Sequence, residues 1–153
     1  MTGPTPAQIH KVTDLIRELA RRYLLLESGL ANELDDLRKS ELQVLELIAL
    51  YHADTVSAVA QKGQVPLSTA SWLVNNLVEQ NYLVRETDQT DRRIQRLKLA
   101  ERGEKVLHFL EDAFSAMALQ RLNAANPEQA SALVHLSEEM LDQFEQEAEL
   151  KHT

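Results

Sequence analysis

The feature that most constrains the fold is a helix with a polar face that is followed at once by a charged hairpin. Over residues 67–80, apolar side chains recur at spacings of three and four, which predicts a helix with one buried stripe. Residues 82–85 and 94–99 have the composition of two strands joined by a polar loop. Between Arg85 and Lys98, five cationic side chains accompany three anionic ones, so the hairpin is locally positive. This order predicts a helical core with a polar helix face and a cationic hairpin on its surface.

The rest of the chain is expected to be helical. Only four glycines and four prolines occur in 153 residues, which predicts long, uninterrupted helices. Asp54-Thr55 offers an N-cap for a short helix, and Gly63 is expected to end that helix in the left-handed conformation. Apolar spacings predict four further helices, over residues 9–30, 40–51, 101–123 and from Pro127 onward.

Residues 64–66 form the turn between the short helix and the polar helix. Pro66 suits the first turn of the polar helix, where its missing N–H costs nothing. Asn81 follows the helix, and asparagine tolerates the left-handed conformation. Trp72 is expected to cover the core between the helices, with DNA sugar and phosphate as its alternative partner. Two helices joined by a short turn and followed by a two-stranded wing form a winged helix-turn-helix, which binds DNA through groove and backbone together.

The net charge of −8 is unevenly distributed along the chain. Residues 103–153 carry three basic and ten acidic side chains, whereas residues 1–34 are neutral. Because the acidity is C-terminal and the hairpin is positive, the domain can approach DNA in one orientation only. The acidic total counts against tight non-specific binding to nucleic acid.

Several classes of function are disfavoured by what the sequence lacks. The absence of cysteine removes disulfides and thiolate metal sites. No apolar run reaches the roughly 18 residues of a membrane span, and the first residues lack a secretion signal, so we expect a cytoplasmic protein without a membrane partner. Without a phosphate loop or a nucleophile motif, neither an enzyme nor a cofactor is expected. His108 and Asp112 have metal-ligand spacing on a predicted helix, but a surface or core-edge histidine is the favoured interpretation.

The first and last helices carry apolar stripes that are too wide for the winged region to cover. On a monomer, such stripes would form a large exposed apolar patch. Interleaving of these helices between two chains would bury them in a homodimer. Twofold symmetry would then present two polar helices to one face of DNA about one helical turn apart, as a pseudo-palindromic operator requires.

Three segments share one family's pattern. They are Leu37–Leu45 (LRKSELQVL), Leu67–Leu77 (LSTASWLVNNL), and the hairpin's Asp88-x-x-Asp91-Arg92-Arg93 followed by Leu97-x-Leu99 and Gly103. In this order they resemble the MarR (multiple antibiotic resistance regulator) family of bacterial transcription regulators. The resemblance covers the whole chain in element order and residues 37–107 in motif.

The resemblance implies a mostly α fold and a regulatory function. Residues 1–153 would form a single MarR-like domain, with a winged helix-turn-helix core at 35–102 and a small β-hairpin wing. Residues 1–34 and 103–153 would supply the flanking N- and C-terminal dimerisation helices. The implied function is a DNA-binding transcriptional regulator, a ligand-responsive repressor that binds double-stranded DNA at a pseudo-palindromic operator as a homodimer.

The sequence departs from the family at several positions of the polar helix. Pro66 stands where a capping aspartate is usual, and Trp72 and Asn76 stand where arginines are common. No cation occurs between Leu67 and Val78. Because phosphate contacts release counterions, the affinity for DNA is expected to be lower than is usual for the family.

The polar helix and the wing supply the candidate DNA-binding residues. On the helix they are Ser68, Thr69, Ser71, Asn75 and Asn76. Small polar side chains at a helix start can reach base edges, and asparagine can contact adenine or phosphate. The alternative is a solvated polar face without a ligand.

In the wing, Arg93 resembles the tip arginine that enters the minor groove, with Asp91 as the carboxylate that orients it. A planar guanidinium suits a narrow, negative groove, whereas the alternative is an exposed ion pair of little energetic weight. The other arginines either contact phosphates or pair with Glu86 and Asp88 inside the wing; they are Arg85, Arg92 and Arg96.

The resemblance also implies a small-molecule effector, bound where the dimerisation helices meet the winged domain. Its candidate ligand-binding residues are Tyr23, Tyr51, His52 and His108, with plain core packing as the alternative. A rival function is a degenerate winged-helix protein-interaction module with weak DNA binding. The cation-free helix and the net charge of −7 over residues 103–153 motivate this rival.

Overall fold

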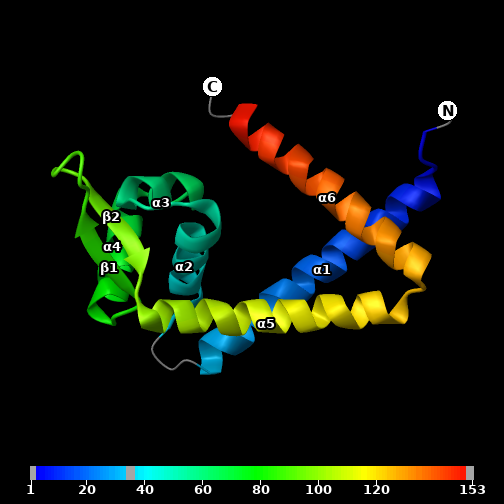
Figure 1. The fold of residues 1–153 in the computed structure, drawn as a ribbon, viewed down its shortest axis with the longest axis horizontal. Coiled ribbons are helices and arrows are strands. Elements are labelled where there is room, and N and C mark those ends of the chain that lie inside the picture. The colour runs from blue at the N-terminus through cyan, green and yellow to red at the C-terminus, as the bar shows by residue number, and fades with distance from the viewer. Residues whose placement is uncertain (1–2, 34–36, 151–153) are drawn as a thin grey trace. The chain divides into compact units, whose positions relative to one another are not determined.

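A computed structural model describes residues 3–33 and 37–150 of the chain. These residues form helices and one β-hairpin (Figure 1), as the sequence predicted. The elements are α1 (Pro6–Glu33), α2 (Lys39–Tyr51), α3 (Val56–Lys62), α4 (Leu67–Glu79), β1 (Leu83–Thr87), β2 (Gln95–Leu99), α5 (Glu101–Ala124) and α6 (Pro127–Leu150). None of these helices is both long and apolar enough to cross a membrane.

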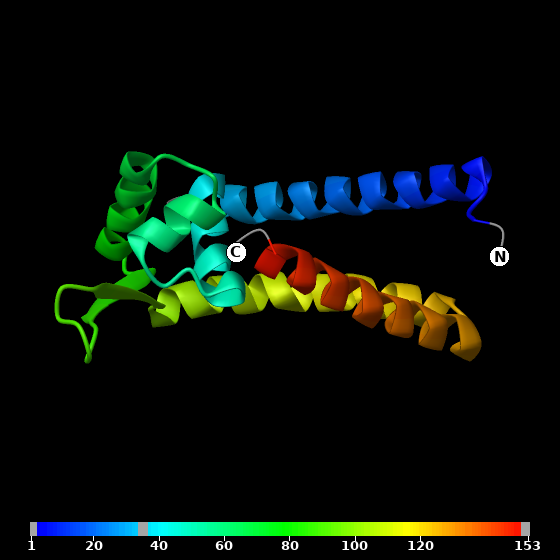
Figure 2. The ribbon, with the colours of Figure 1, turned by 90° about the horizontal axis from the view of Figure 1, so that it is seen from above.

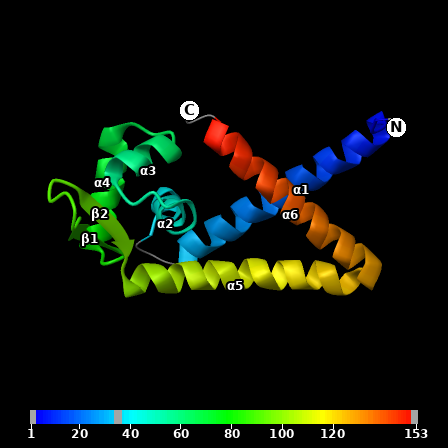
Figure 3. The same ribbon diagram turned by 45° about the horizontal axis from the view of Figure 1, so that its top comes forward.

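The chain divides into two compact units, residues 1–110 and residues 111–153. The first unit contains α1 to α4, the hairpin and the start of α5. Within it, α4 lies beside both α3 and β1, and α2 contacts α3 and α4 (Figure 3). This arrangement is a winged helix-turn-helix, in which α3 and α4 are the paired helices and the hairpin is the wing.

The core of the first unit is built from the apolar stripes that the sequence predicted for α2 and α4. Leu42 and Leu45 of α2 and Leu77 of α4 are fully buried. The hairpin closes this core with Leu83 and Leu97, which are also buried. Other buried apolar residues of this unit are Leu37, Val44, Ile48, Ala53, Val59, Ala70, Leu73, Val74, Tyr82, Val106 and Leu110.

The turn between α3 and α4 differs from the sequence prediction at Gly63. Thr55 caps α3 as expected, since its hydroxyl accepts the Ala58 N–H at 3.2 Å. Gly63, however, has a right-handed φ of −78°, and the left-handed residue is Gln64, with a φ of 53°. A Cβ at Gly63 would lie 2.8 Å from the Val59 carbonyl oxygen. Glycine is therefore required here for close packing rather than for its handedness.

The ends of α4 follow the sequence prediction more closely. Asn81 has a φ of 59°, which confirms the expected left-handed residue after α4. The Tyr82 N–H donates to the Leu77 carbonyl at 2.8 Å and so closes the helix end. At the other end, Pro66 is the N-cap rather than a first-turn residue. The prediction for Pro66 was wrong by one position, and a proline has no capping side chain in either place.

β1 begins one residue later and ends two residues later than expected, whereas β2 begins one residue later and ends at Leu99 as predicted. β1 and β2 pair antiparallel, with Leu83 opposite Leu99 and Thr87 opposite Gln95. The Leu97 N–H donates to the Asp54 carbonyl at 2.7 Å, so β2 is fastened to the loop before α3. The loop between the strands projects away from the helices of its unit (Figure 2). The wing is thus anchored at its base and extended at its tip.

The apolar stripes of the terminal helices, which the sequence predicted to be too wide for one winged region to cover, are exposed within the single chain. On α1, a stripe that starts at Ile9 and continues through Leu19 is about half exposed. On α6, the apolar residues of the stripe are also exposed within the single chain; they are Leu133, Leu136, Met140, Leu141 and Phe144. A helix stripe is buried only where another element covers it, and within one chain little of either stripe is covered.

Candidate nucleic-acid interface

The outer face of α4 carries most of the helix residues that the sequence predicted to bind DNA. Ser68, Thr69 and Asn75 are exposed, whereas Ser71 and Asn76 are half-buried at its edges. The opposite face is the buried stripe described above. The helix therefore presents a narrow row of small hydroxyl and amide groups, which can donate and accept hydrogen bonds at base edges.

Asn75 is joined to the base of the wing. Its side-chain oxygen accepts a hydrogen bond from the Arg85 guanidinium at 2.6 Å. Arg85 lies on β1, so this bond couples α4 to the first strand of the hairpin. Arg85 occupies one lone pair of the Asn75 oxygen, so the other lone pair and the amide nitrogen remain available to a ligand.

Asn76 takes part in a polar connection inside the unit. Its amide donates to Oε1 of Glu41 at 3.3 Å, and Oε2 of Glu41 accepts the Arg38 backbone N–H at 2.8 Å. Glu41 is almost fully buried. The side chain of Asn76 thus ties α4 to the start of α2, which limits its freedom to reach DNA.

Trp72 does not lie in the core, contrary to the favoured prediction. It is 47% exposed, and the Arg38 guanidinium carbon lies 5.0 Å from the centre of its ring. The side chain projects from the outer face of α4, because Trp72 follows Ser68 by four residues. The buried positions of α4 are already filled by smaller aliphatic residues, which leaves the indole on the surface.

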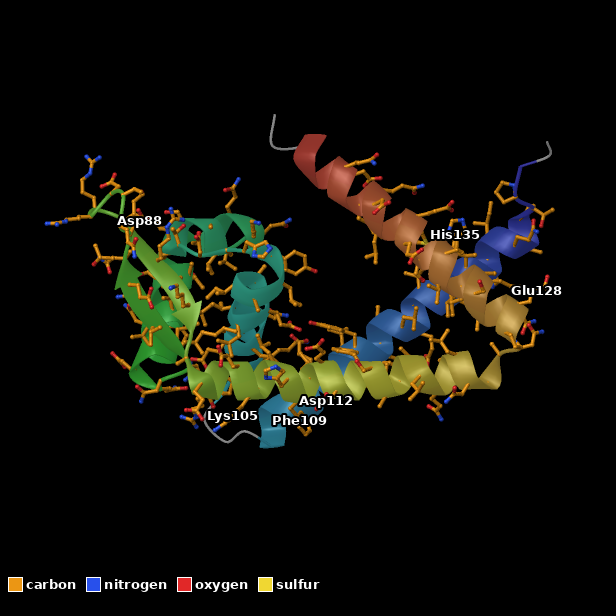
Figure 4. The ribbon with its side chains drawn as sticks, in the orientation of Figure 1. Asp88, Lys105, Phe109, Asp112, Glu128 and His135 are labelled. Carbon is orange, nitrogen blue, oxygen red and sulfur yellow. The ribbon has the colours of Figure 1, made fainter. Side chains whose placement is uncertain are left out.

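The wing tip is organised by Asp88 (Figure 4). Its Oδ1 accepts the backbone N–H groups of Thr90 and Asp91 at 2.8 and 3.0 Å. Hydrogen bonds from the Thr90 hydroxyl and the Asp91 N–H, together with one from Arg96, hold the pKa of Asp88 well below its ordinary value. Asp88 is therefore ionised at neutral pH and fixes the loop that carries the next two arginines.

Asp91 holds Arg93 in the geometry that the sequence suggested. Nε of Arg93 lies 3.1 Å from Oδ1 of Asp91, and a terminal nitrogen lies 3.0 Å from Oδ2. The Arg93 backbone N–H also donates to Oδ1, at 3.0 Å. The hydrogen bonds from Arg93 lower the pKa of Asp91. The Arg93 side chain is 90% exposed, so the forked pair displays its guanidinium at the wing tip.

Arg96 has an internal role that sequence reasoning left open. It donates to Asp88 at 2.8 Å and to Asp54 at 2.6 Å. These bonds join the wing to the loop before α3, and Asp54 was not recognised beforehand as part of the site. Arg92 is exposed and forms no ion pair with a described residue. At the wing, Arg92 and Arg93 are thus the arginines that face outward.

Two of the residues proposed for a small-molecule site lie close enough to interact, since Tyr51 acts electrostatically on Tyr23. Tyr23 donates its hydroxyl to Glu46 at 2.6 Å, which joins α1 to α2. Burial and this hydrogen bond raise the pKa of Tyr23. Tyr51, His52 and His108 are exposed.

Glu27 is fully buried beside the contact between Tyr23 and Glu46, and its Oε2 lies 3.1 Å from the Lys39 ammonium. No group of three or more His, Asp or Glu residues suited to a metal occurs among the described residues.

Comparisons with known proteins support both the family resemblance and the fold. Residues 35–94 match the sequence model of the MarR family. No curated protein matches the chain.

Three solved structures illustrate the similarity of fold. A MarR family protein from Bacillus stearothermophilus is 18% identical, with a TM-score of 0.70 over 95% of this chain and 98% of that one. Streptococcus pneumoniae FabT, solved in complex with DNA, is 22% identical, with a TM-score of 0.64 over 91% and 98%. MepR from S. aureus, solved with ethidium bromide, is 18% identical, with a TM-score of 0.64 over 86% and 95%.

Proposed function

Residues 35–94 form a MarR-family domain within a fold that other MarR proteins share, and from this premise we propose that the protein is a DNA-binding transcriptional regulator. It binds a pseudo-palindromic operator as a homodimer and represses transcription by occluding a promoter. The observation that carries the proposal is the combination of a polar, exposed α4 face with a wing tip that displays Arg93. Proteins of this architecture place the helix in the major groove and use flanking segments on the backbone or in the minor groove.

The role of the wing follows from the geometry of its ion pair. Arg93 is held by Asp91 through two side-chain hydrogen bonds, yet it is almost fully exposed. An isolated surface pair contributes little to the free energy of folding, so stability does not account for the arrangement. A pre-oriented guanidinium loses less side-chain entropy when it enters a narrow minor groove. Arg92, at the same tip, binds a neighbouring phosphate.

The homodimer is supported by the exposed apolar faces of the terminal helices. Leu136 and Phe144 of α6 are 52% and 59% exposed, and Ile16 of α1 is 56% exposed. Contiguous apolar surfaces of this kind mark interaction sites. An isologous interface between two copies buries the same surface on each and aligns two α4 helices with a palindromic site.

The effector is proposed to bind near the junction of α1 and α2. The Tyr23 hydroxyl donates to Glu46 at this junction. Helix α2 ends at Tyr51, and His52 is its C-cap. His108 of α5 is the fourth proposed ligand-binding residue. A small molecule that alters the packing of α1 against α2 would change the placement of the winged region relative to its partner's, which couples binding of the effector to binding of DNA.

The proposal is tested by fluorescence-anisotropy titration of the protein with the DNA upstream of its own gene. The titration is made at 50 and 200 mM salt and repeated with a shuffled sequence of equal length. A regulator binds the upstream DNA more tightly than the shuffled control and loses affinity steeply with salt. Micromolar binding that ignores sequence would instead favour the protein-interaction module.

A further inference from the structure

The proposed recognition helix α4 lacks a positive charge of its own. From Leu67 to Glu79 it contains no lysine, arginine or histidine, and Glu79 at its end is acidic. Phosphate contacts supply much of the affinity of DNA-binding proteins. A neutral helix in the major groove therefore needs a cation from another element close to its outer face.

Trp72 lies in the middle of that outer face. It follows Ser68 by four residues and precedes Asn75 by three, so the three side chains share one side of the helix. All three are exposed, and Trp72 is the largest apolar side chain on this polar surface. An exposed indole has a flat face on which a guanidinium can stack.

Arg38 occupies the face of this indole. It is the N-cap of α2, its guanidinium lies 5.0 Å from the centre of the Trp72 ring, and its side chain is exposed. Its backbone is fixed, because its N–H donates to Glu41, which also accepts the Asn76 amide. Arg38 is thus attached to α4 at two points, through the ring of Trp72 and through Glu41.

Two other cations near α4 are already hydrogen-bonded, one to the helix itself and one to its C-cap. Arg85 donates to Asn75. Arg102 lies over the ring of Tyr82 and donates to the Gln80 carbonyl at the opposite end of the helix. Arg38, by contrast, has no carboxylate partner among the described residues, and stacking leaves the N–H edge of its guanidinium free to donate.

We propose that Arg38, stacked on Trp72, binds a backbone phosphate of the DNA beside α4 and so supplies the cation that this helix lacks. The proposal rests on the proposed function and adds a contact from α2. Trp72 is the positioning residue, since its ring fixes the plane of the guanidinium. The sequence alone offered no sign of this, because Arg38 precedes Trp72 by 34 positions.

The first test compares Arg38→Ala with the parent chain in DNA titrations over a range of salt concentrations. Loss of one phosphate contact lowers the slope of log affinity against log salt by about 0.9. The affinity ratio between 50 and 200 mM salt should therefore shrink by about threefold to fourfold. Lys105→Ala removes one exposed cation from α5 (Figure 4) and should leave the slope unchanged.

A second variant separates charge from stacking. Arg38→Lys keeps the positive charge but loses the planar group that lies on the ring. It should retain most of the salt slope and bind more weakly than the parent at every salt concentration. Trp72→Ala should weaken binding in the same way as Arg38→Lys, because the cation remains but is no longer oriented.

The stack itself is tested without DNA. Trp72 is the single tryptophan of the chain, so intrinsic fluorescence reports on it alone. Acrylamide should quench Trp72 more strongly in Arg38→Ala than in the parent, because the guanidinium no longer covers one face of the ring. Addition of DNA should protect Trp72 from acrylamide in the parent chain. Circular dichroism checks that each variant retains its helices.

The outcomes distinguish this inference from the proposed function. If the parent chain binds DNA without sequence preference or salt dependence, both the regulator and the Arg38 contact are overturned. If the parent binds as a regulator and Arg93→Ala lowers the slope while Arg38→Ala does not, the Arg38 contact alone is wrong. Unchanged acrylamide quenching in Arg38→Ala would also overturn it, because the stack would then be absent in solution.

Discussion

Helices α4 and α6 carry the same kind of apolar periodicity but differ in what covers it. The stripe of α4, which includes Leu73, Val74 and Leu77, is buried by α2, α3 and the hairpin. The stripe of α6 is exposed along its length within the chain. The polar face of α4 is the exposed one, so we assign it to DNA, and we assign the apolar face of α6 to a second copy of the chain. The same apolar periodicity thus serves different functions in the two helices, depending on whether other elements of the chain cover the apolar face.

The first prediction concerns the face of α6. Leu136→Glu combined with Phe144→Glu should convert the proposed homodimer into a 17.3 kDa monomer or unfold it, since both side chains are exposed within one chain. Sedimentation at micromolar concentration measures the change. A matched double substitution of exposed polar residues, Gln129→Glu with Gln143→Glu, should leave the assembly intact. A parent chain that sediments as a stable monomer would contradict the assignment of α6.

The second prediction concerns the buried face of α4. Leu77→Ala removes a fully buried side chain from the core, which should lower the free energy of unfolding by about 2–5 kcal/mol. Urea unfolding followed by circular dichroism measures the loss. Leu141→Ala on α6 serves as the contrast, because its effect should depend on protein concentration as dimer formation does. If Leu141→Ala lowers the free energy of unfolding by the same amount at every protein concentration, the stripes of α4 and α6 do not differ as we describe.

The third prediction concerns the exposed face of α4. Asn75→Ala and Ser71→Ala should change the preference among operator variants by about 1–3 kcal/mol where either side chain contacts a base. Arg85→Ala is the control, since it removes the bond to Asn75 while leaving the asparagine in place. Competition titrations with single-base operator variants measure the preference. Identical preferences in parent and variants would show that α4 does not contact bases at these positions.

The fourth prediction compares α4 with the wing. Arg93→Ala should lower the slope of log affinity against log salt by about 0.9, and Arg85→Ala should have a smaller effect. Asp91→Ala should also weaken binding, because it releases the guanidinium that it holds. Simple charge counting predicts tighter DNA binding by Asp91→Ala, since the substitution removes a negative charge near DNA. Tighter binding by Asp91→Ala would therefore show that Asp91 does not orient Arg93.

The fifth prediction concerns an acid buried inside the first unit. Burial and the nearby Glu27 carboxylate raise the pKa of Glu46 above its ordinary 4.5, and the hydrogen bond from Tyr23 opposes them. A raised pKa means that folding favours the protonated form, so its contribution to stability is present below pH 4.5 and is lost as the pH rises through the folded pKa. Urea unfolding from pH 4 to 8 should show Glu46→Gln gaining stability relative to the parent over that rise.

A control for this prediction uses the same hydrogen bond. Tyr23→Phe removes the hydrogen bond that lowers the pKa of Glu46, so the loss of stability should move to higher pH. If Glu46→Gln and the parent keep a constant difference across the pH range, Glu46 is not held in its protonated form by the fold.

The sequence by itself determined the elements and the contacts that are short in sequence. Periodicity located the ends of the helices and strands within three residues, with the largest difference at α1, because each helix or strand repeats its own pattern of burial. The Asp91–Arg93 pair was also predictable, because the wing motif resembles that of the MarR family and the two residues lie only two positions apart. Thr55 and Asn81 were recognised for the same reason, as caps depend on neighbouring residues.

The tertiary structure decided the contacts between elements that lie far apart in sequence. Arg96 meets Asp54 across 42 positions, and Asn76 meets Glu41 across 35. Periodicity states which face of a helix is polar but not which residue of another element stands opposite. Packing of α2 against α4 therefore placed Trp72 on the surface beneath Arg38. Packing likewise left the stripe of α6 uncovered, because burial depends on the partner as well as on the pattern.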